Sequence, residues 1–161
     1  MLLIRHAHAG SRRDWDGDDT GRPLSARGMA QAASLVGRLE GWAPVRVLSS
    51  PYRRCLQTVE PLAAALGVGV EIATELAEGA DGAALGLVRR VGRQSVALCT
   101  HGDIIPMVLE ALAAEDGLDV GSRLRQAKGS TWVLEERAGR FVTARYLPPP
   151  DGGTGLSRSD R

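Results

Sequence analysis

Two histidines and two arginines stand where they could act together on a phosphoryl group. Arg5 and His6 follow a short apolar run, Arg54 follows the segment Ser49-Ser50-Pro51, and His101 follows the apolar run of residues 95–99. Neutral imidazole is a good nucleophile toward phosphorus, and cations stabilise the charge that a phosphoryl group carries during transfer. Nearby arginines also disfavour imidazolium and so keep the nucleophile neutral. The four side chains therefore predict phosphoryl transfer to an imidazole without a metal.

The predicted strands explain how these distant residues could meet. Apolar runs predict buried strands over residues 1–4, 45–48, 68–72 and 95–99. Arg5-His6, Ser49-Ser50 and Thr100-His101 each follow one of these runs. Ligands of parallel sheets bind beyond the carboxyl ends of the strands, so we expect these residues on one rim.

Helices are predicted between the strands. Ser25 is placed to cap a helix, Pro51 stands at the first turn of a second helix, and Gly67 ends that helix. The expected apolar face of the first helix consists of Met29, Ala32, Ala33, Val36 and Leu39. Further helices are expected over 80–91 and 104–112, and a β-hairpin over 131–146. This order predicts an α/β fold, a three-layer sandwich with a mostly parallel central sheet.

Composition narrows the classes of protein. The 161 residues carry 20 basic and 19 acidic side chains, a net charge of +1, which argues against a nucleic-acid partner. Lys128 is the single lysine, so the other cations are arginines. We expect a cytoplasmic protein without a signal peptide, a membrane span or a membrane partner. One domain is expected over residues 1–147, followed by a disordered tail over 148–161 rich in Pro, Gly and Ser.

Three motifs in order resemble those of the histidine phosphatase superfamily, which has the phosphoglycerate mutase-like fold. Residues 3–7 (Leu-Ile-Arg-His-Ala) are similar to its strand-terminal Arg-His-Gly signature. Residues 49–58 resemble its Ser-Ser-Pro-x-x-Arg-Ala-x-Gln-Thr motif, and residues 100–102 its His-Gly motif. Residues 22–25 together with Gly28 resemble the Pro-Leu-(Ser/Thr)-x-x-Gly start of its first helix. Ala7 departs from the family's usual glycine, a mild change if φ is negative there.

The resemblance implies roles for particular residues. His6 would be phosphorylated and then hydrolysed by water, while Arg5, Arg54 and His101 hold the phosphoryl oxygens. The family's general acid follows the third strand, where Glu78 fits and Glu75 is the alternative. The resemblance implies no cofactor and no metal.

Substrate contacts are expected beyond this group. Arg12, Arg22 and the backbone at Gly102 are candidate substrate-binding residues, because arginine binds phosphate bidentately and a helix N-terminus offers N–H donors. The chain resembles most the bacterial phosphohistidine phosphatases and the histidine phosphatase domain fused to some actinobacterial Nudix hydrolases. The expected partner is therefore a phosphohistidine protein or a phosphorylated small molecule, and a nucleotide phosphatase is the alternative.

Two other classes of protein stay open, and a third is excluded. A pseudo-phosphatase could bind phosphorylated partners without turnover, and His6, His8 and His101 could in principle bind zinc. Neither Cys55 nor Cys99 is followed by an arginine at the spacing of a cysteine phosphatase, so we expect both to be buried small hydrophobes.

Overall fold

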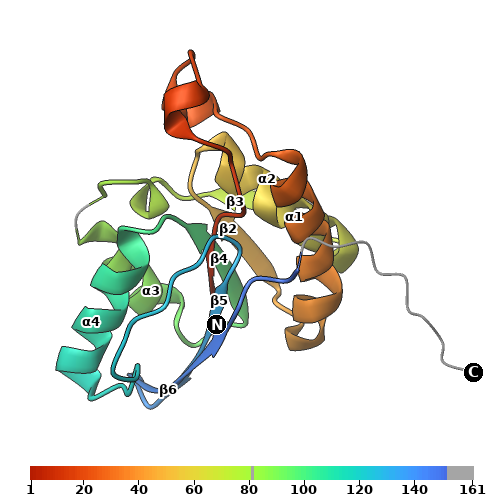
Figure 1. Cartoon of the computed structure of the whole chain (residues 1–161). Coiled ribbons are helices and arrows are strands. Elements are labelled where there is room, and N and C mark those ends of the chain that lie inside the picture. The colour runs from red at the N-terminus through yellow and green to blue at the C-terminus, as the bar shows by residue number, and fades with distance from the viewer. Residues whose placement is uncertain (81, 152–161) are drawn as a thin grey trace, which may run out of the picture.

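A single mixed sheet forms the centre of the molecule (Figure 1). The computed structural model describes residues 1–80 and 82–151. The strands are β1 (Leu2–Arg5), β2 (Arg46–Ser49), β3 (Val70–Ile72), β4 (Val96–Thr100), β5 (Thr131–Arg137) and β6 (Arg140–Leu147), in the order β3-β2-β4-β1-β5-β6. Strands β3, β2, β4 and β1 are parallel, whereas β5 pairs antiparallel with both β1 and β6. The predicted fold class is confirmed.

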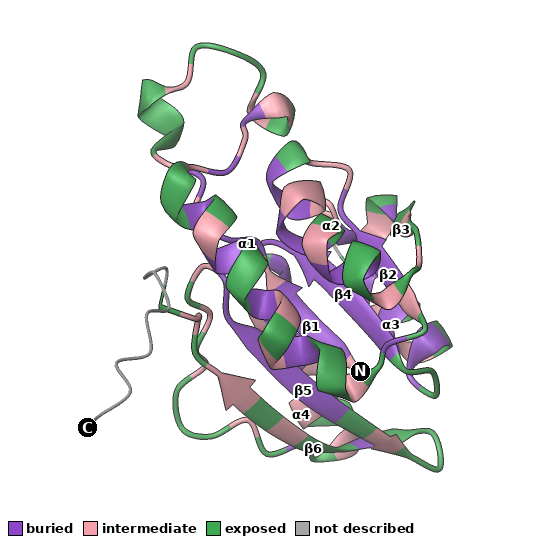
Figure 2. Cartoon of the chain, turned by 90° about the vertical axis from the view of Figure 1, so that its right-hand side faces the viewer, coloured by how far each residue is buried: buried purple, intermediate pink, exposed green. Residues whose placement is uncertain are grey.

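Helices cover both faces of the sheet, and the strand register decides which residues each face buries. The helices are α1 (Ala26–Leu39), α2 (Arg53–Leu66), α3 (Ala83–Val91) and α4 (Ile104–Asp116). Successive residues of β1 alternate: Leu3 packs in the cluster under α3 and α4, whereas Leu2 and Ile4 pack in the cluster under α1 and α2. The central strands are consequently buried on both sides, as Figure 2 shows. The strands that carry the candidate site residues are therefore packed on both faces.

Short 3₁₀ turns lie in the connections between the strands and helices. They are η1 (Arg12–Asp14), η2 (Asp19–Gly21), η3 (Glu40–Trp42) and η4 (Thr74–Leu76). None of the helices in the described part of the chain is long and apolar enough to cross a membrane. Residues 152–161, most of the predicted tail, lie outside the described residues.

The predicted face of α1 is partly wrong. Met29 is 47% exposed and Ala33 is exposed, while Gly28, Gln31 and Leu35 are buried. The helix is turned so that Gly28, which has no side chain, lies against the carbonyl of His8. Apolar periodicity alone could not predict that a glycine and a glutamine would take the inner face.

The expected cap of α1 and the expected end of α2 are confirmed, whereas the expected start of α2 is wrong. Ser25 caps α1, its Oγ accepting from the Gly28 N–H at 3.2 Å, and Gly67 ends α2 at φ 69°. However, α2 begins at Arg53 rather than at Pro51. The hydroxyl of Ser50 lies 2.8 Å from His101 Nε2 and accepts from the Tyr52 N–H at 3.3 Å, one residue ahead of the helix.

Candidate active site

The predicted site residues converge on one pocket at the carboxyl ends of β1 and β4. This phosphate pocket, as we call it, has a volume of about 230 Å³. It is lined by Arg5, His6, Arg12, Arg22, Arg54, Glu78, His101, Gly102, Asp103 and Lys128. Every residue predicted for catalysis or substrate binding is in this set, although the sequence separates them by up to 97 positions. Arginine and histidine dominate the lining, which suits a phosphorylated ligand.

His6 is buried and neutral. Its ring Nδ1 lies 2.8 Å from the carbonyl oxygen of Ala7, which can only accept, so Nδ1 carries the proton and Nε2 keeps its lone pair. Burial lowers the pKa of His6 to about 3; the Ala7 hydrogen bond opposes this shift, and the charges of His101, Arg54 and Arg5 add to it. The imidazole is therefore in the protonation state that a nucleophile needs.

Ala7 fits the position where the family usually has glycine. Its φ is not among the positive values of the described residues, so a Cβ causes no backbone strain. The Ala7 N–H donates to Thr58 Oγ1 at 2.9 Å, and Thr58 Oγ1 donates to the Arg54 carbonyl at 2.7 Å. These bonds connect the end of β1 to the first turns of α2.

Arg54 is the most constrained cation of the site. Its guanidinium is buried and donates to the Asp19 carbonyl at 2.8 Å and to Glu78 Oε2 at 2.9 Å. It also lies 4.7 Å from the centre of the Tyr52 ring and 3.5 Å from His101 Nδ1. A residue in the first turn of α2 thus reaches the ends of β1 and β4.

Arg5 is held by backbone rather than by a carboxylate. Its Nη1 donates to the carbonyl of Gln126, and burial lowers its pKa. A Cβ on Gly102 would lie 2.7 Å from the guanidinium carbon of Arg5. A side chain at Gly102 would therefore displace the Arg5 guanidinium from its place in the phosphate pocket.

The two candidate acids lie in different places. Glu78 accepts from Arg54 and from Arg12 Nη2, each at 2.9 Å, and lines the phosphate pocket. Glu75 pairs with Arg90 at 2.9 Å and does not line it. The structure therefore places Glu78, the preferred candidate, in the same pocket as His6 and leaves Glu75 on η4, paired with Arg90 of α3.

Sequence reasoning missed several residues of the site. Asp19 accepts from Arg22 Nε at 2.8 Å and pairs with Arg12 and Arg54, each at 3.1 Å. Lys128 lines the phosphate pocket, with a pKa lowered by burial and by the nearby arginines. These two residues had no predicted role in the site, because both lie in connections between strands and helices, where apolar periodicity predicts no position.

His101 has partners that were missed as well. Its Nε2 lies 2.8 Å from Ser50 Oγ and 3.5 Å from Cys55 Sγ, and Tyr52 packs edge-on at 4.7 Å. Asp103 accepts from the Gly79 N–H at 2.8 Å and so fixes the loop that carries Glu78. The Ser-Ser-Pro motif and the position directly after His101-Gly102 could have pointed to Ser50 and Asp103.

Other candidates lie outside the phosphate pocket. His8 contacts Ser25 Oγ at 2.7 Å, Arg53 is exposed, and Cys55 and Cys99 are buried and free. Within the described ranges, no group of three His, Cys, Asp or Glu side chains could hold a metal ion. The three-histidine grouping considered for zinc is thus not assembled there.

Comparison with known proteins agrees with this geometry. An 8-oxo-(d)GTP phosphatase of Mycolicibacterium smegmatis is 38% identical over 160 residues, covering 94% of this chain and 48% of that protein. The chain thus spans about half the length of this relative.

Solved structures are also similar. A candidate phosphohistidine phosphatase SixA from Agrobacterium tumefaciens is 26% identical with a TM-score of 0.74, covering 92% of this chain and 97% of that one. A second SixA candidate, from Nakamurella multipartitia, is 25% identical with a TM-score of 0.66, covering 92% and 95%. Residues 1–91 match the model of the histidine phosphatase superfamily, branch 1, and the predicted enzyme class is confirmed at the level of the family. The chain belongs to the histidine phosphatase superfamily (branch 1).

Proposed function

We propose that the chain is a phosphatase that forms a phosphohistidine on His6 and needs no metal. The observation that carries this proposal is a buried, neutral imidazole whose Nε2 lone pair is free, in a pocket with Arg5, Arg54 and His101. Such an arrangement supplies both a nucleophile and fixed charges for the phosphoryl oxygens.

The proposed reaction has two steps. His6 Nε2 attacks phosphorus, the bond from phosphorus to the leaving group breaks, and the leaving group takes a proton from Glu78. For this step Glu78, which pairs with Arg12 and Arg54 in the free chain, must be protonated when the substrate is bound. Water then attacks the phosphohistidine, the P–N bond breaks, and the Glu78 carboxylate takes the proton of the water as phosphate leaves. Arg5, Arg54 and His101 hold the phosphoryl oxygens in both steps, while Arg12, Arg22 and the Gly102 backbone contact the rest of the substrate.

The substrate class rests on similarity. The SixA neighbours support a phosphohistidine protein as the substrate, and a small phosphorylated metabolite is the other substrate that we propose. The relative from M. smegmatis, an 8-oxo-(d)GTP phosphatase, favours a nucleotide as the second candidate. Action in the cytoplasm stays a prediction from the sequence.

Trapping the intermediate tests the mechanism directly. Brief incubation with a ³²P-labelled phosphodonor should leave acid-labile, base-stable label on the wild type and none on His6→Ala. His8→Ala is the matched control, since His8 lies in the same segment but outside the phosphate pocket, and it should label like the wild type. Turnover by His6→Ala would overturn the mechanism.

Two further outcomes separate the other classes of protein. Binding of phosphorylated ligands with no turnover of any donor would identify a pseudo-phosphatase. Loss of activity with a chelator and its return with zinc would identify a zinc hydrolase. Activity that is indifferent to chelator is the expected result.

A further inference from the structure

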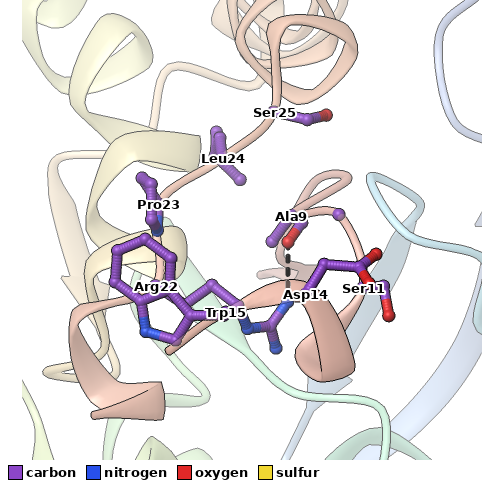
Figure 3. Close-up of a pocket in the computed structure, with 9 residues that line it drawn as sticks. Ala9, Ser11, Asp14, Trp15, Arg22, Pro23, Leu24 and Ser25 are labelled. Carbon is purple, nitrogen blue, oxygen red and sulfur yellow. Dashed lines mark hydrogen bonds between the residues drawn. The ribbon is translucent and has the colours of Figure 1, made fainter. Parts of the chain in front are cut away.

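A second pocket lies beside the phosphate pocket, inside the loop between β1 and α1. It has a volume of about 260 Å³, and its lining includes Ala9, Asp14, Trp15, Arg22, Pro23 and Leu24 (Figure 3). We call it the ring pocket. Arg22 lines both pockets, and each is smaller than the ~300–1,000 Å³ of a complete small-molecule site. Adjacent pockets of this size fit two parts of one ligand better than two ligands.

Trp15 is fixed in place although it has no core behind it. The turn η1 next to it contains no buried residue. Nevertheless, the indole Nε1 donates to the Asp18 carbonyl at 2.9 Å, and the ring packs so closely over Gly17 that a Cβ there would lie 3.1 Å from it. A half-buried aromatic ring held rigidly on an exposed loop offers a surface on which a planar group can stack.

The remaining lining indicates what kind of planar group would fit. Pro23 and Leu24 make the pocket largely apolar, while Asp14 adds a carboxylate. A carboxylate repels a second phosphate but accepts hydrogen bonds from ring N–H groups. Arg22 is held between the pockets by the Ala9 carbonyl at 2.7 Å and by Asp19 at 2.8 Å. The ring pocket therefore suits a heterocycle with N–H donors, attached to a phosphate beyond Arg22.

We propose that the ring pocket binds the base of a nucleotide whose terminal phosphate lies in the phosphate pocket. The base stacks on Trp15, and Asp14 accepts from its N–H edge. A guanine-type base fits best, because its neighbouring ring N–H and amino group can both donate to one carboxylate. This inference rests on the proposed function, since it places the leaving group of the same reaction.

A comparison of two substrates tests the ring pocket. GDP carries a base, whereas acetyl phosphate has no ring. Trp15→Ala should lower the ratio of kcat/KM for GDP to that for acetyl phosphate by about tenfold, through KM, because base stacking on an aromatic side chain typically contributes that much or more. Trp15→Phe keeps a stacking face and should restore most of the ratio. Trp42→Phe, on η3 at the far end of β2, is the matched control and should leave it unchanged.

Tryptophan fluorescence gives a readout that does not require turnover. In a His6→Ala background, GDP should quench fluorescence; Trp15→Phe should abolish the quench, and Trp42→Phe should keep it. An unchanged substrate ratio in Trp15→Ala, or a quench that survives Trp15→Phe, would refute the ring pocket. Failure of the wild type to hydrolyse GDP and acetyl phosphate, together with no label on His6 from any phosphodonor, would instead refute the proposed function, and the quench would still decide whether the base binds at Trp15.

Discussion

Burial of one imidazole determines the chemistry of the site at the scale of single residues. His6 is 5% exposed, and the cations around it favour the uncharged ring. The same burial that makes His6 a nucleophile at neutral pH also couples protonation to folding, because the unfolded chain has no such environment.

The pH dependence of stability should report this coupling. The pKa of His6 is about 3 in the folded chain against 6.5 for an ordinary histidine, so between these values the unfolded state binds a proton that the folded state does not. The free energy of unfolding should therefore fall as pH is lowered through this window, by about 2 kcal/mol from pH 7 to pH 5 for this residue. Denaturation by urea at both pH values measures it. His6→Asn should show a smaller fall, and an equal fall in both proteins would contradict the assignment.

Asp19 organises three arginines from two segments of the chain. Burial alone would raise the pKa of this carboxyl, but the hydrogen bond from Arg22 and the charges of Arg54, Arg22 and Arg12 outweigh it, and the net shift is downward. The carboxylate is thus charged and fixes the guanidinium groups before substrate arrives.

Asp19→Asn should separate positioning from binding. With the carboxylate gone, the guanidiniums lose their alignment while the pocket becomes more positive. We expect kcat to fall about 10- to 100-fold, and inhibition by inorganic phosphate to stay equal or become stronger. Asp16→Asn, in the same loop and exposed, is the control. Weaker phosphate inhibition together with unchanged kcat would show that Asp19 does not position the arginines.

At the scale of elements, the close approach of helix α1 to the loop after β1 positions residues of the site. Helix α1 lies against the loop that follows β1: a Cβ on Gly28 would be 2.0 Å from the His8 carbonyl oxygen. Gln31, one turn later, accepts from the His8 N–H at 3.0 Å. The helix thereby holds His8, and with it the loop in which His6 precedes His8 and Arg12 follows it.

Two glycines of α1 should respond in opposite ways to alanine. Gly28→Ala should destabilise the fold by more than about 2 kcal/mol, because the new methyl group meets rigid backbone. In Gly37→Ala the methyl group meets nothing within 4 Å, so helix propensity should stabilise the protein by up to about 1 kcal/mol. Thermal denaturation of both variants measures the contrast. Equal stability of the two would show that the loop moves freely away from α1.

The whole molecule concentrates positive charge without being basic. Its net charge is +1, yet five of its cations line the phosphate pocket, where Glu78 and Asp103 balance part of their charge. Attraction for a phosphorylated ligand therefore arises locally rather than from a general field.

Much of the site was predictable because its central residues follow local patterns. Apolar runs fixed the strands, and a residue that directly follows a buried parallel strand must lie at the sheet rim, which is why Arg5, His6 and His101 could be placed. Glycine and serine signals predicted the ends of α1 and α2 in part. The face of α1 was predicted wrongly, because contact with His8 outweighs apolar periodicity.

By itself the sequence determined which residue types stand at the strand ends, and thereby the class of chemistry. Only the tertiary structure decided which loop residues join them: Glu78 rather than Glu75, and Asp19, Lys128 and the ring pocket around Trp15. The physical reason is the distance along the chain over which each signal acts. Strand and helix patterns arise from neighbours a few positions apart, whereas the path of a loop depends on charges and backbone groups that only folding brings together.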